Sequence, residues 1–367
     1  MELNQVISDA IHDILPTAEV VKIPVADGGE GWVDALMQVL GGERITCWVE
    51  DPLGNPVQAS YAWVEETKTA VIEMAAASGI SLIPWKEGNV MYTTTKGTGE
   101  LIADALERGC KRIWLGIGGS ATNDAGIGML QALGFHFRDK DGQEIKGGGA
   151  YLKEIAEMDD SMANPLLSSC RIEVATDVRN PFYGKEGAAY VFARQKGASE
   201  EQVALLDEGL RHLADKIQKQ YGVDLQDCSG SGAAGGLGGG CYLFLHAPLL
   251  SGISMLKRIL HFDETIQDAD LIITGEGKMD VQTEQGKLLW GILESAGKYH
   301  VPVVAITGNC AEQSGKMEEN PLLATFPIHP APVSLSDAMQ PDYARLQVSR
   351  TIHSVIKLIS FGKKTCS

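Results

Sequence analysis

The sequence lacks the long apolar runs that mark membrane proteins. None of its apolar runs approaches the roughly 18 residues needed to span a bilayer. The chain opens on an amphipathic segment, whereas a secretory signal peptide begins with a basic stretch followed by an apolar one. We therefore expect a cytoplasmic protein that does not insert into membranes.

Positive charge is also scarce. Lysine and arginine together number 31 against 48 aspartate and glutamate residues, and the formal net charge is -17. Such a chain repels polyanions and anionic membrane surfaces, which argues against nucleic acid and membranes as partners. A nucleotide can still bind where backbone N–H groups, helix N-termini and a divalent cation supply positive potential locally. Glycine loops are therefore more informative here than the number of lysines.

Patterned cysteines and histidines are absent. The seven cysteines are odd in number, widely spaced and form no C-x-x-C pair, so we predict reduced thiols. The eight histidines form no H-x-x-x-H or H-x-H spacing, which gives a transition-metal site little support. A magnesium site built from oxygen ligands stays open.

Strand patterns alternate with helical patterns through much of the chain, which is typical of an α/β fold with a largely parallel sheet. In such sheets ligands bind beyond the carboxyl ends of the strands, and several apolar runs here end directly in a glycine or acidic loop. The clearest predicted strands are Val20–Ala26, Arg112–Gly116, Arg171–Ala175, Leu271–Thr274, Val301–Thr307 and Leu322–Pro327.

The pattern changes along the chain in a way that predicts two domains. Between residues 44 and 80, short strands follow one another through Pro and Gly turns without helices, which indicates an antiparallel subdomain. From about residue 265 strands and helices alternate, and residues 20–40 have the same character. We therefore predict a split domain, residues 1–43 plus 266–367, with a second domain of residues 44–265 inserted into it.

Glycines combine with acidic or amide side chains in several short segments. Paired glycines let the backbone approach a phosphate closely, and a neighbouring carboxylate can hold Mg2+ or accept a hydroxyl proton. Each segment alone is more simply explained as a turn and a helix start, but together, mostly at strand ends, they indicate a shared site. The segments are ADGGEG (26–31), GIGGSATND (116–124), ATDVRNP (175–181), GSGAAGGLGGG (230–240) and GEGKMD (275–280).

The acidic residues of these segments are candidates for a general base and for metal ligands. Asp27, Asp280 and Glu276 are expected in strand-to-helix loops, and they would face one cleft if their strands are neighbours. A cluster of like charges is costly without a cation or a shared proton, which suggests Mg2+ or a general base. Asp124 and Asp177 complete the candidate catalytic acids, and the sequence does not separate base from metal ligand.

The segment GSGAAGGLGGG and Lys196 each have two explanations. The segment is too long for a tight turn and fits an anion-binding loop at a helix N-terminus, or a close helix-to-sheet contact that needs small residues. It is not a Walker A loop, because no Gly-Lys-Ser/Thr follows. Lys196 precedes a helix predicted to start near Ser199, and it is either a ligand for phosphate or a substrate carboxylate, or a solvated surface charge.

In combination these segments resemble the bacterial type of glycerate kinase family. The resemblance implies phosphorylation of D-glycerate by ATP with Mg2+, with the 2-hydroxyl as the favoured acceptor, and a homodimer is compatible with it. It also implies a flavodoxin-like domain with an inserted α/β domain described as restriction-endonuclease-like. The motifs that carry it span nearly the whole chain: ADGGEG, EMAAASG (73–79), TTKGTGEL (94–101), GIGGSATND, QKGA (195–198), GAAGG (232–236) and GEGKMD.

On this resemblance, nucleotide and substrate contacts are assigned to the glycine segments, and catalysis is expected to act mainly by positioning and charge stabilisation. Mg2+ is assigned to Asp27, Asp280 and Glu276, and the catalytic acids are Asp27, Asp124, Asp177 and Asp280. The assigned binding residues are Gly28, Gly29, Glu30, Gly118, Gly119, Ser120, Asn123, Lys196, Gly232, Gly235, Gly236, Gly275, Glu276 and Gly277.

The sequence departs from the family pattern in three places. It has FARQKGA where the family usually has FGPQKGA, and it has KMD where RID is common. Both changes preserve the charge and the shape of the segment. The family opens with an apolar strand and a PDSFK loop, whereas this chain begins with a helical pattern from Leu3 that stops at Pro16. We therefore expect a truncated start, with Val20–Ala26 lying across a gap from Leu271–Thr274 or shifted to pair with it.

Two other functions stay open. A Rossmann dehydrogenase is suggested by the strand Arg112–Leu115, the G-x-G-x-x-A pattern from Gly116, and Asp139 about 20 residues further on. Polar and acidic residues at 122–124, where a pyrophosphate-binding helix would begin, argue against it. The second alternative is a non-catalytic protein that binds an acid or a nucleotide without turnover. Consumption of ATP without NAD-dependent turnover would exclude the dehydrogenase, and nucleotide binding without product would identify the binding protein.

Overall fold

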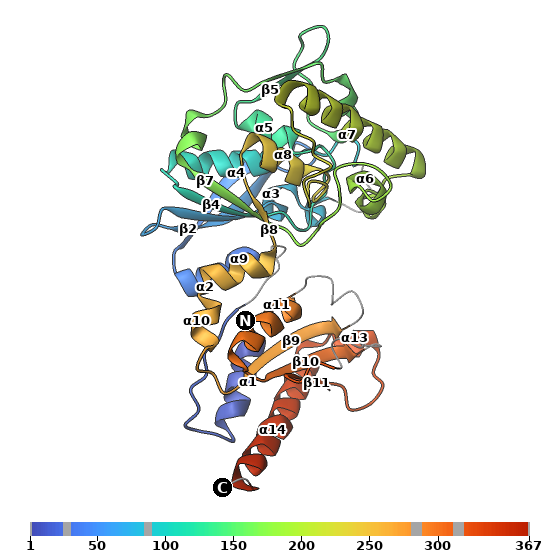
Figure 1. Ribbon diagram of the computed structural model, residues 1–367. Coiled ribbons are helices and arrows are strands. Elements are labelled where there is room, and N and C mark those ends of the chain that lie inside the picture. The colour runs from blue at the N-terminus through green and yellow to red at the C-terminus, as the bar shows by residue number, and fades with distance from the viewer. Residues whose placement is uncertain (1, 25–30, 84–89, 280–287, 311–318, 366–367) are drawn as a thin grey trace. The chain divides into compact units, whose positions relative to one another are not determined.

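The computed structural model describes residues 2–24, 31–83, 90–279, 288–310 and 319–365. The chain forms two compact units, a larger one of residues 26–252 and a smaller one of residues 1–25 with 253–367 (Figure 1). These units meet at residues 25/26 and 252/253, whereas the boundaries predicted from sequence lie at 43/44 and 265/266. Helix α2 (Trp32–Leu40) contacts strands of the larger unit. The predicted α/β fold is confirmed, and the sheets contain both parallel and antiparallel pairs.

The larger unit is built on one six-stranded sheet with the order β1-β2-β3-β4-β7-β8. Strands β1, β2 and β3 pair antiparallel, and β3, β4, β7 and β8 pair parallel, so the predicted antiparallel subdomain is wrong as a separate body. The reason is that β3 is an apolar strand buried on both faces, which lets it pair with β4 and join the two halves. The strands are β1 (Glu43–Glu50), β2 (Pro56–Val64), β3 (Thr69–Glu73), β4 (Arg112–Gly116), β7 (Arg171–Ala175) and β8 (Leu249–Leu250).

Helices and a small hairpin complete the larger unit around an apolar core. The hairpin pairs β5 (His136–Arg138) with β6 (Glu157–Asp159). The helix predicted near Ser199 is confirmed as α7, and Ser199 caps it by accepting a hydrogen bond from Gln202 N–H at 3.2 Å. The helices are α3 (Ala75–Ser78), α4 (Lys96–Glu107), α5 (Ile127–Ala132), α6 (Ala188–Phe192), α7 (Glu200–Tyr221) and α8 (Leu237–Phe244), with 3-10 turns η1 (Ile80–Leu82), η2 (Gly149–Glu154), η3 (Pro165–Ser169) and η4 (Arg194–Lys196).

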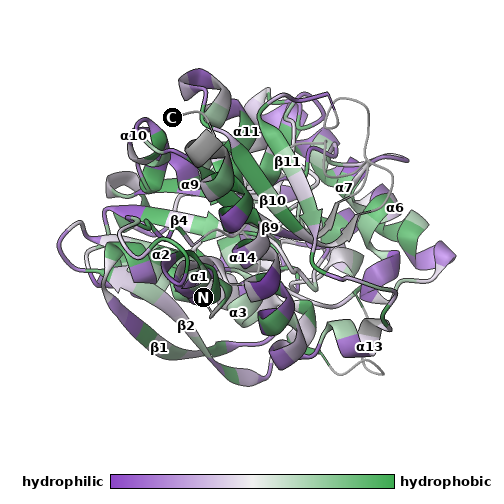
Figure 2. Ribbon diagram, turned by 90° about the horizontal axis from the view of Figure 1, so that it is seen from below, coloured by the Kyte–Doolittle hydropathy of each residue, from purple (hydrophilic) through white to green (hydrophobic). Residues whose placement is uncertain are grey.

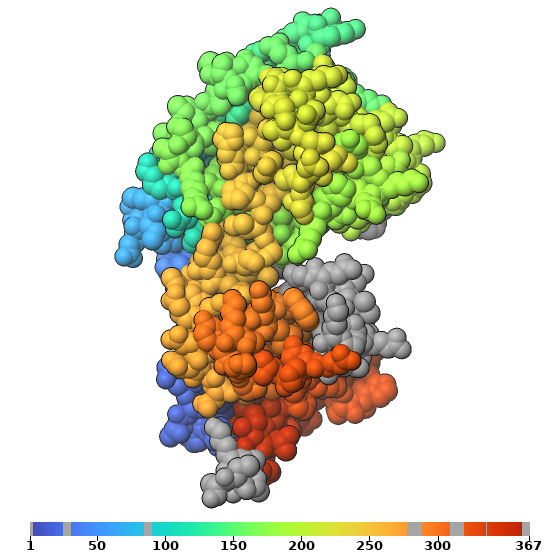
Figure 3. Space-filling view, viewed as in Figure 1, coloured from blue at the N-terminus to red at the C-terminus, as the bar shows by residue number. Residues whose placement is uncertain are grey.

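The smaller unit places helices on both faces of a parallel sheet with the order β11-β10-β9. Side chains of β10 alternate: Val303 and Ala305 pack with α11, while Val304 and Ile306 pack with α1 and α14, and Figure 2 colours this strand largely as hydrophobic. Figure 3 shows the N-terminal surface (blue) adjoining the C-terminal surface (red) of this unit. Its elements are α1 (Glu2–His12), α9 (Gly252–Ile259), α10 (Phe262–Ile266), β9 (Ile272–Met279), α11 (Leu288–Tyr299), β10 (Val303–Cys310), β11 (Leu323–Pro327), α13 (Leu335–Ala338) and α14 (Pro341–Thr365).

The predicted strand Val20–Ala26 is wrong over its described residues, 20–24, which are irregular. A strand needs a hydrogen-bonded neighbour, and in the described sheet β9 pairs with β10 alone. Val20 instead packs into the apolar cluster with Ile273, and Lys22 Nζ donates to Gln5 Oε1 of α1 at 2.8 Å. The helical pattern at the start of the chain is confirmed as α1.

No helix in the described parts of the chain is both long and apolar enough to cross a membrane.

Candidate active site

Three loops meet where the parallel strands β3, β4 and β7 reach their carboxyl ends. Met74 N–H, just after β3, donates to the carbonyl of Gly116 at 2.9 Å, and Ile117 N–H, just after β4, donates to Ala175 at 3.3 Å. Ile80 N–H then donates to the carbonyl of Gly119 at 2.9 Å. The segment Gly118–Ser120 is thereby held between neighbours at the edge where ligands of open parallel sheets bind.

Lys196 lies beneath this segment and is largely buried, with 7% of its surface exposed. Its Nζ donates to Ser120 Oγ and to the carbonyl oxygen of Thr122, both at 2.7 Å. Burial lowers the pKa of Lys196 to about 7, and the charge of Asp124 opposes this shift only in part. The alternative of a solvated surface lysine is therefore excluded, and the site holds an amine that can gain or lose its charge near neutral pH.

Asp124 is fully buried and connects the loop after β4 with the start of α4. Its carboxylate accepts hydrogen bonds from Thr95 N–H at 2.8 Å, Thr95 Oγ1 at 2.9 Å, Gly126 N–H at 3.2 Å and Gly128 N–H at 3.3 Å. Burial raises the pKa of this carboxyl group, and the hydrogen bonds from Thr95, Gly126 and Gly128 oppose the rise. Asp124 therefore positions the loop, and its catalytic role stays a prediction.

The glycine segment 230–240 packs against the same loop. A Cβ at Gly235 would lie 2.1 Å from the carbonyl oxygen of Thr122, and one at Gly232 would lie 2.1 Å from that of Pro181. Ala125 N–H donates to the carbonyl of Gly235 at 3.0 Å, and Gly236, with φ of 90°, directly precedes α8. Close backbone contact therefore explains these glycines, and their role as phosphate ligands stays a prediction.

Several buried polar atoms on these two loops have no hydrogen-bond partner in the described part of the chain. They are the hydroxyl of Thr122, both polar atoms of the Asn123 amide and the hydroxyl of Ser231, and all three residues are fully buried. Buried polar atoms are normally paired with protein or with ordered water. The region between the two loops is therefore polar inside the core, unlike the apolar packing around it.

The comparisons with known proteins agree with one another along the whole chain. The family model described as "Glycerate kinase family" matches residues 1–360. A glycerate kinase from Bacillus subtilis (strain 168) is 42% identical over 99% of this chain and 94% of its own length. The chain belongs to the glycerate kinase family. A glycerate 2-kinase from Escherichia coli (strain K12) is 43% identical over 97% of this chain and 94% of its own length.

A solved structure supports the same family assignment. The crystal structure of a candidate glycerate kinase 2 from Salmonella typhimurium LT2 superposes with a TM-score of 0.87 at 40% identity. The match covers 99% of this chain and 95% of that one. The mixed α/β fold described above is thus the fold of a protein related over almost its full length.

The remaining residues assigned to the candidate site divide into three groups. Asp177 accepts a hydrogen bond from Gly252 N–H, the first residue of α9, at 3.0 Å. The predictions for Asp27, Gly28, Gly29, Glu30 and Asp280, including a cleft shared by Asp27 and Asp280, lie outside the described residues. Gly275, Glu276 and Gly277 belong to the smaller unit.

The expected loop position of Gly275, Glu276 and Gly277 is wrong. Strand β9 continues through them to Met279, with Glu276 opposite Thr307 of β10. The apolar run ends at Thr274, but a strand ends where its partner stops pairing, and β10 supplies partners as far as Cys310. Glu276 therefore lies within the paired part of strand β9 and not in a strand-to-helix turn.

Two threonines that hold the loop after β4 were missing from the sequence-based assignment. Besides its bonds to Asp124, Thr95 Oγ1 accepts a hydrogen bond from Met129 N–H at 2.9 Å, and Thr93 Oγ1 donates to the carbonyl of Ala121 at 2.9 Å. Both side chains are fully buried. The available signal was the segment TTKGTGEL, which contains Thr95 and carries part of the family resemblance.

The dinucleotide-binding loop of a Rossmann dehydrogenase is not formed at the G-x-G-x-x-A pattern. Residues 117–126 are not helical, and α5 starts only at Ile127, well after Ala121. The next strand, β5, pairs antiparallel with β6 instead of joining the parallel sheet. A helix N-terminus therefore does not face the position that a pyrophosphate would take, and this alternative is wrong.

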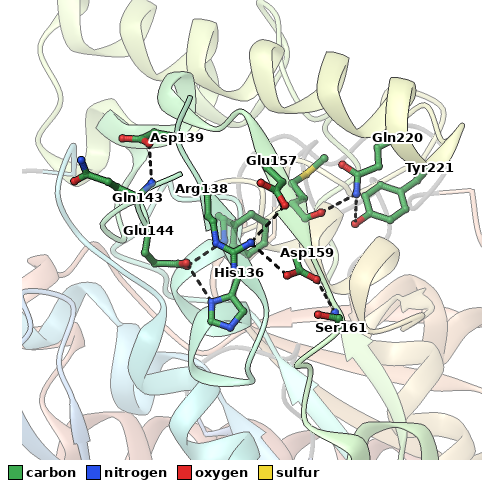
Figure 4. Close-up of polar contacts among 12 residues, drawn as sticks. His136, Arg138, Asp139, Gln143, Glu144, Glu157, Asp159, Ser161, Gln220 and Tyr221 are labelled. Carbon is green, nitrogen blue, oxygen red and sulfur yellow. Dashed lines mark hydrogen bonds and ion pairs between the residues drawn. The ribbon is translucent and has the colours of Figure 1, made fainter. Parts of the chain in front are cut away.

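Polar side chains also cluster on the β5–β6 hairpin, as Figure 4 shows, but they cross-link the hairpin. The guanidinium of Arg138 pairs with Glu157 at 3.4 Å and with Asp159 at 3.3 Å, both on β6. His136 Nδ1 lies 3.1 Å from the Glu144 carboxylate. These contacts account for the cluster as a structural feature of the hairpin.

A resident metal has no complete ligand set in the described part of the chain. No group of three or more His, Cys, Asp or Glu residues there is arranged to hold a metal ion. Two of the three carboxylates assigned to Mg2+, Asp27 and Asp280, are outside the described residues. The assignment of Mg2+ to these carboxylates therefore stays a prediction.

Proposed function

We propose that this chain is an ATP-dependent kinase that phosphorylates D-glycerate, preferentially on the 2-hydroxyl. Membership of the glycerate kinase family supports kinase chemistry, and the name of the Escherichia coli relative, glycerate 2-kinase, supports the 2-hydroxyl. The observation that carries the proposal is the buried amine of Lys196 under the loop Gly118–Ser120. Both substrates are anions, and a buried cation at the carboxyl edge of a parallel sheet is suited to hold one.

Lys196 and Ser120 would hold an anionic oxygen, either of the glycerate carboxylate or of a phosphate. The ammonium group has three N–H donors, of which two bind Ser120 and Thr122, and the third has no partner among the described residues. Ser120 is partly exposed, so it connects the buried amine with the open side of the loop. An anion bound there would gain one direct charge-assisted bond and would favour the protonated lysine.

The other assigned residues would support this arrangement. Asp124 fixes the loop, and the backbone of Gly118 and Gly119 would approach the ligand, with Gly119 at a φ of 72° that suits glycine. Asn123 with the loop of Gly232, Gly235 and Gly236 would complete the phosphate contacts. Catalysis would then consist mainly of aligning the hydroxyl with the γ-phosphate and stabilising charge.

The candidates for the base and the magnesium ligands are the acids of the outer segments. Mg2+ would be held by Asp27, Asp280 and Glu276, since carboxylate oxygens are ligands that Mg2+ accepts. Asp177 remains a further candidate acid.

We also propose that residues 1–43 plus 266–367 form a flavodoxin-like domain and that residues 44–265 form an inserted restriction-endonuclease-like domain. The enzyme is proposed to be cytoplasmic. The parallel three-stranded sheet covered on both faces supports the first of these assignments.

Turnover of ATP and D-glycerate tests the proposal. We expect ADP and phosphoglycerate to appear in equal amounts, because one phosphoryl group is transferred per cycle. EDTA should abolish turnover, since the nucleotide is expected to act as its magnesium complex. A coupled ADP assay with and without D-glycerate measures both effects. Binding of ATP without any product would instead identify the chain as a non-catalytic binding protein.

Replacing Asp27 or Asp280 by Asn should lower kcat by roughly 100-fold or more, because each change removes a charge expected to act as base or metal ligand. The melting temperature should change little, since Asn keeps the size of the side chain. Asp342→Asn, at a highly exposed position on α14, is the matched control and should keep normal kcat. Near-normal kcat in both test variants would reassign these acids as helix caps.

A further inference from the structure

Ser120 and Lys196 form a pair whose geometry suits nucleophilic catalysis as well as anion binding. The Ser120 Oγ and Lys196 Nζ atoms lie 2.7 Å apart. Ser120 is partly exposed, whereas Lys196 is buried behind it. An accessible hydroxyl in hydrogen-bond contact with a base is the arrangement that activates serine in Ser–His and Ser–Lys hydrolases. The pair therefore allows a reaction that the binding of an anion does not use.

The surroundings of Lys196 favour its neutral amine. In the described part of the chain its two hydrogen-bond partners are the Ser120 hydroxyl and the Thr122 carbonyl, and neither carries a charge. A buried ammonium group without a carboxylate in contact loses hydration that no ion pair offsets. Among the described residues, Asp124 is the charged group whose field acts on Lys196, and its carboxylate is bound by other donors. Lys196 is therefore available as a base.

The neutral amine also matches its two partners. It has two N–H donors and one lone pair, so one N–H donates to the Thr122 carbonyl at 2.7 Å while the lone pair accepts the proton of the Ser120 hydroxyl. In the protonated form the ammonium group donates to Ser120 Oγ instead and cannot accept a proton from it. The neutral form thus activates Ser120, whereas the protonated form is the one proposed above to hold an anion.

Backbone donors for a developing oxyanion lie in the same turn. The N–H groups of Gly118, Gly119 and Ser120 donate to no other atom of the described part of the chain. Successive free N–H groups in a turn form a concave site for an anion. Donors of this kind stabilise the tetrahedral intermediate of acyl transfer. One loop therefore supplies the nucleophile and candidate oxyanion donors, and Lys196 supplies the base.

We propose that Ser120 is a nucleophile activated by Lys196 and that it takes acyl groups from activated esters of small carboxylic acids. The acyl group is expected to be small because Ala75 packs against the turn: a Cβ at Gly119 would lie 3.3 Å from the Ala75 side chain. The reaction requires neither ATP nor Mg2+. It is therefore independent of the proposed kinase function.

The reaction has two steps. Ser120 Oγ bonds to the acyl carbon while its proton passes to Lys196 Nζ, and the ester C–O bond then breaks as the ammonium group returns the proton to the leaving oxygen. In the second step water attacks the acyl carbon, Lys196 accepts a proton from that water, and Ser120 Oγ regains a proton as it leaves. The sum is the conversion of an ester and water to an acid and an alcohol.

Labelling by a fluorophosphonate and hydrolysis of p-nitrophenyl acetate, both without ATP and Mg2+, test the proposal with the full chain. The fluorophosphonate should form a covalent adduct that peptide mass spectrometry places on Ser120, and Ser120→Ala should lose it. Lys196→Met should lower both rates by roughly 100-fold or more. Because the pKa of Lys196 is about 7, the wild-type labelling rate should rise with pH and level off above that value.

Ser60→Ala is the matched control. Ser60 is also partly exposed, and its Oγ accepts a hydrogen bond from Arg44 Nη1 at 3.2 Å. A guanidinium group stays protonated and cannot act as a base, so Ser60 should not be labelled. Its replacement should leave both rates unchanged. Circular dichroism spectra that match the wild type would show that the variants remain folded.

Several outcomes would overturn the proposal. They are an unlabelled Ser120 in the folded wild type, equal labelling of Ser60 and Ser120, an acetyl group on Lys196 in place of Ser120, and a wild-type labelling rate that does not change around pH 7. Formation of ADP and phosphoglycerate without labelling of Ser120 would reject this inference and leave the kinase proposal intact. Labelling of Ser120 in a protein that does not phosphorylate glycerate would support the inference and reject the kinase proposal.

Discussion

Replacing Lys196 by methionine is expected to lower kcat/KM by roughly 100-fold or more. The substitution keeps an unbranched side chain of similar length in the buried position and removes the cation proposed to bind an anionic oxygen. If the anion is the glycerate carboxylate, most of the loss should appear in KM for glycerate. If it is the transferred phosphate, the loss should appear in kcat. Steady-state kinetics with each substrate varied in turn measures the difference.

Lys185→Met is the control for the loss of a positive charge, because Lys185 is exposed. It should leave both constants unchanged. A Lys196→Met enzyme with normal kinetics for both substrates would contradict the proposed role. Substitution at Lys196 also leaves the Thr122 carbonyl without its charged donor, so the variant's fold should be checked by circular dichroism.

The same lysine should make stability depend on pH. Burial lowers its pKa from 10.5 to about 7, so between these values the unfolded chain binds a proton that the folded chain has lost. The free energy of unfolding should therefore rise with pH from about 7 to about 10.5. Urea titrations at several pH values should show this rise in the wild type and a smaller rise in Lys196→Met. Identical slopes in the two proteins would mean that Lys196 titrates as an ordinary lysine.

Replacing Asp124 by Asn should destabilise the larger unit by about 3 kcal/mol or more. The Asp124 carboxylate accepts four hydrogen bonds from fully buried donors, and the new amide NH2 group would face some of those donors instead. Because the loop after β4 carries Ser120, activity should also fall. Urea unfolding followed by tryptophan fluorescence gives the change in stability.

Asp139→Asn is the matched control for Asp124→Asn. Asp139 Oδ1 accepts hydrogen bonds from Asp141 N–H at 2.8 Å and Gln143 N–H at 2.9 Å in an exposed turn on the hairpin of Figure 4. Water can replace those bonds, so the loss should be below about 1 kcal/mol. Equal losses of stability in the two variants would show that the burial of Asp124 does not determine the cost of replacing it.

Local pattern was sufficient to predict the buried parallel strands. Strands β4 and β7 have the bounds predicted from sequence, since each is a short apolar run that ends at a polar or glycine loop. The first helix and the start of a helix near Ser199 were also predicted, because the signals for each lie within a few residues of each other. The family resemblance then supplied the chemistry, which the pattern alone did not.

Features set by distant partners were predicted poorly. Val20 lies in an apolar run like that of a strand, yet no neighbour pairs with its segment, while β9 runs past its apolar part because β10 continues beside it. Lys196 could not be distinguished from a surface lysine, since its burial depends on Ser120, which is 76 residues away. The glycines at 232 and 235 make the close backbone contacts that one of the two sequence-based explanations required, and their role in anion binding stays a prediction.

Phosphorus NMR of the products formed from ATP and D-glycerate is the most direct test of the central claim. The account predicts ADP together with a phosphomonoester coupled to the hydrogen on carbon 2 of glycerate. Loss of that signal in Lys196→Met, with its retention in Lys185→Met, would tie the reaction to the site described here. Unchanged ATP and D-glycerate after incubation with Mg2+, or turnover of D-glycerate only with NAD, would contradict it.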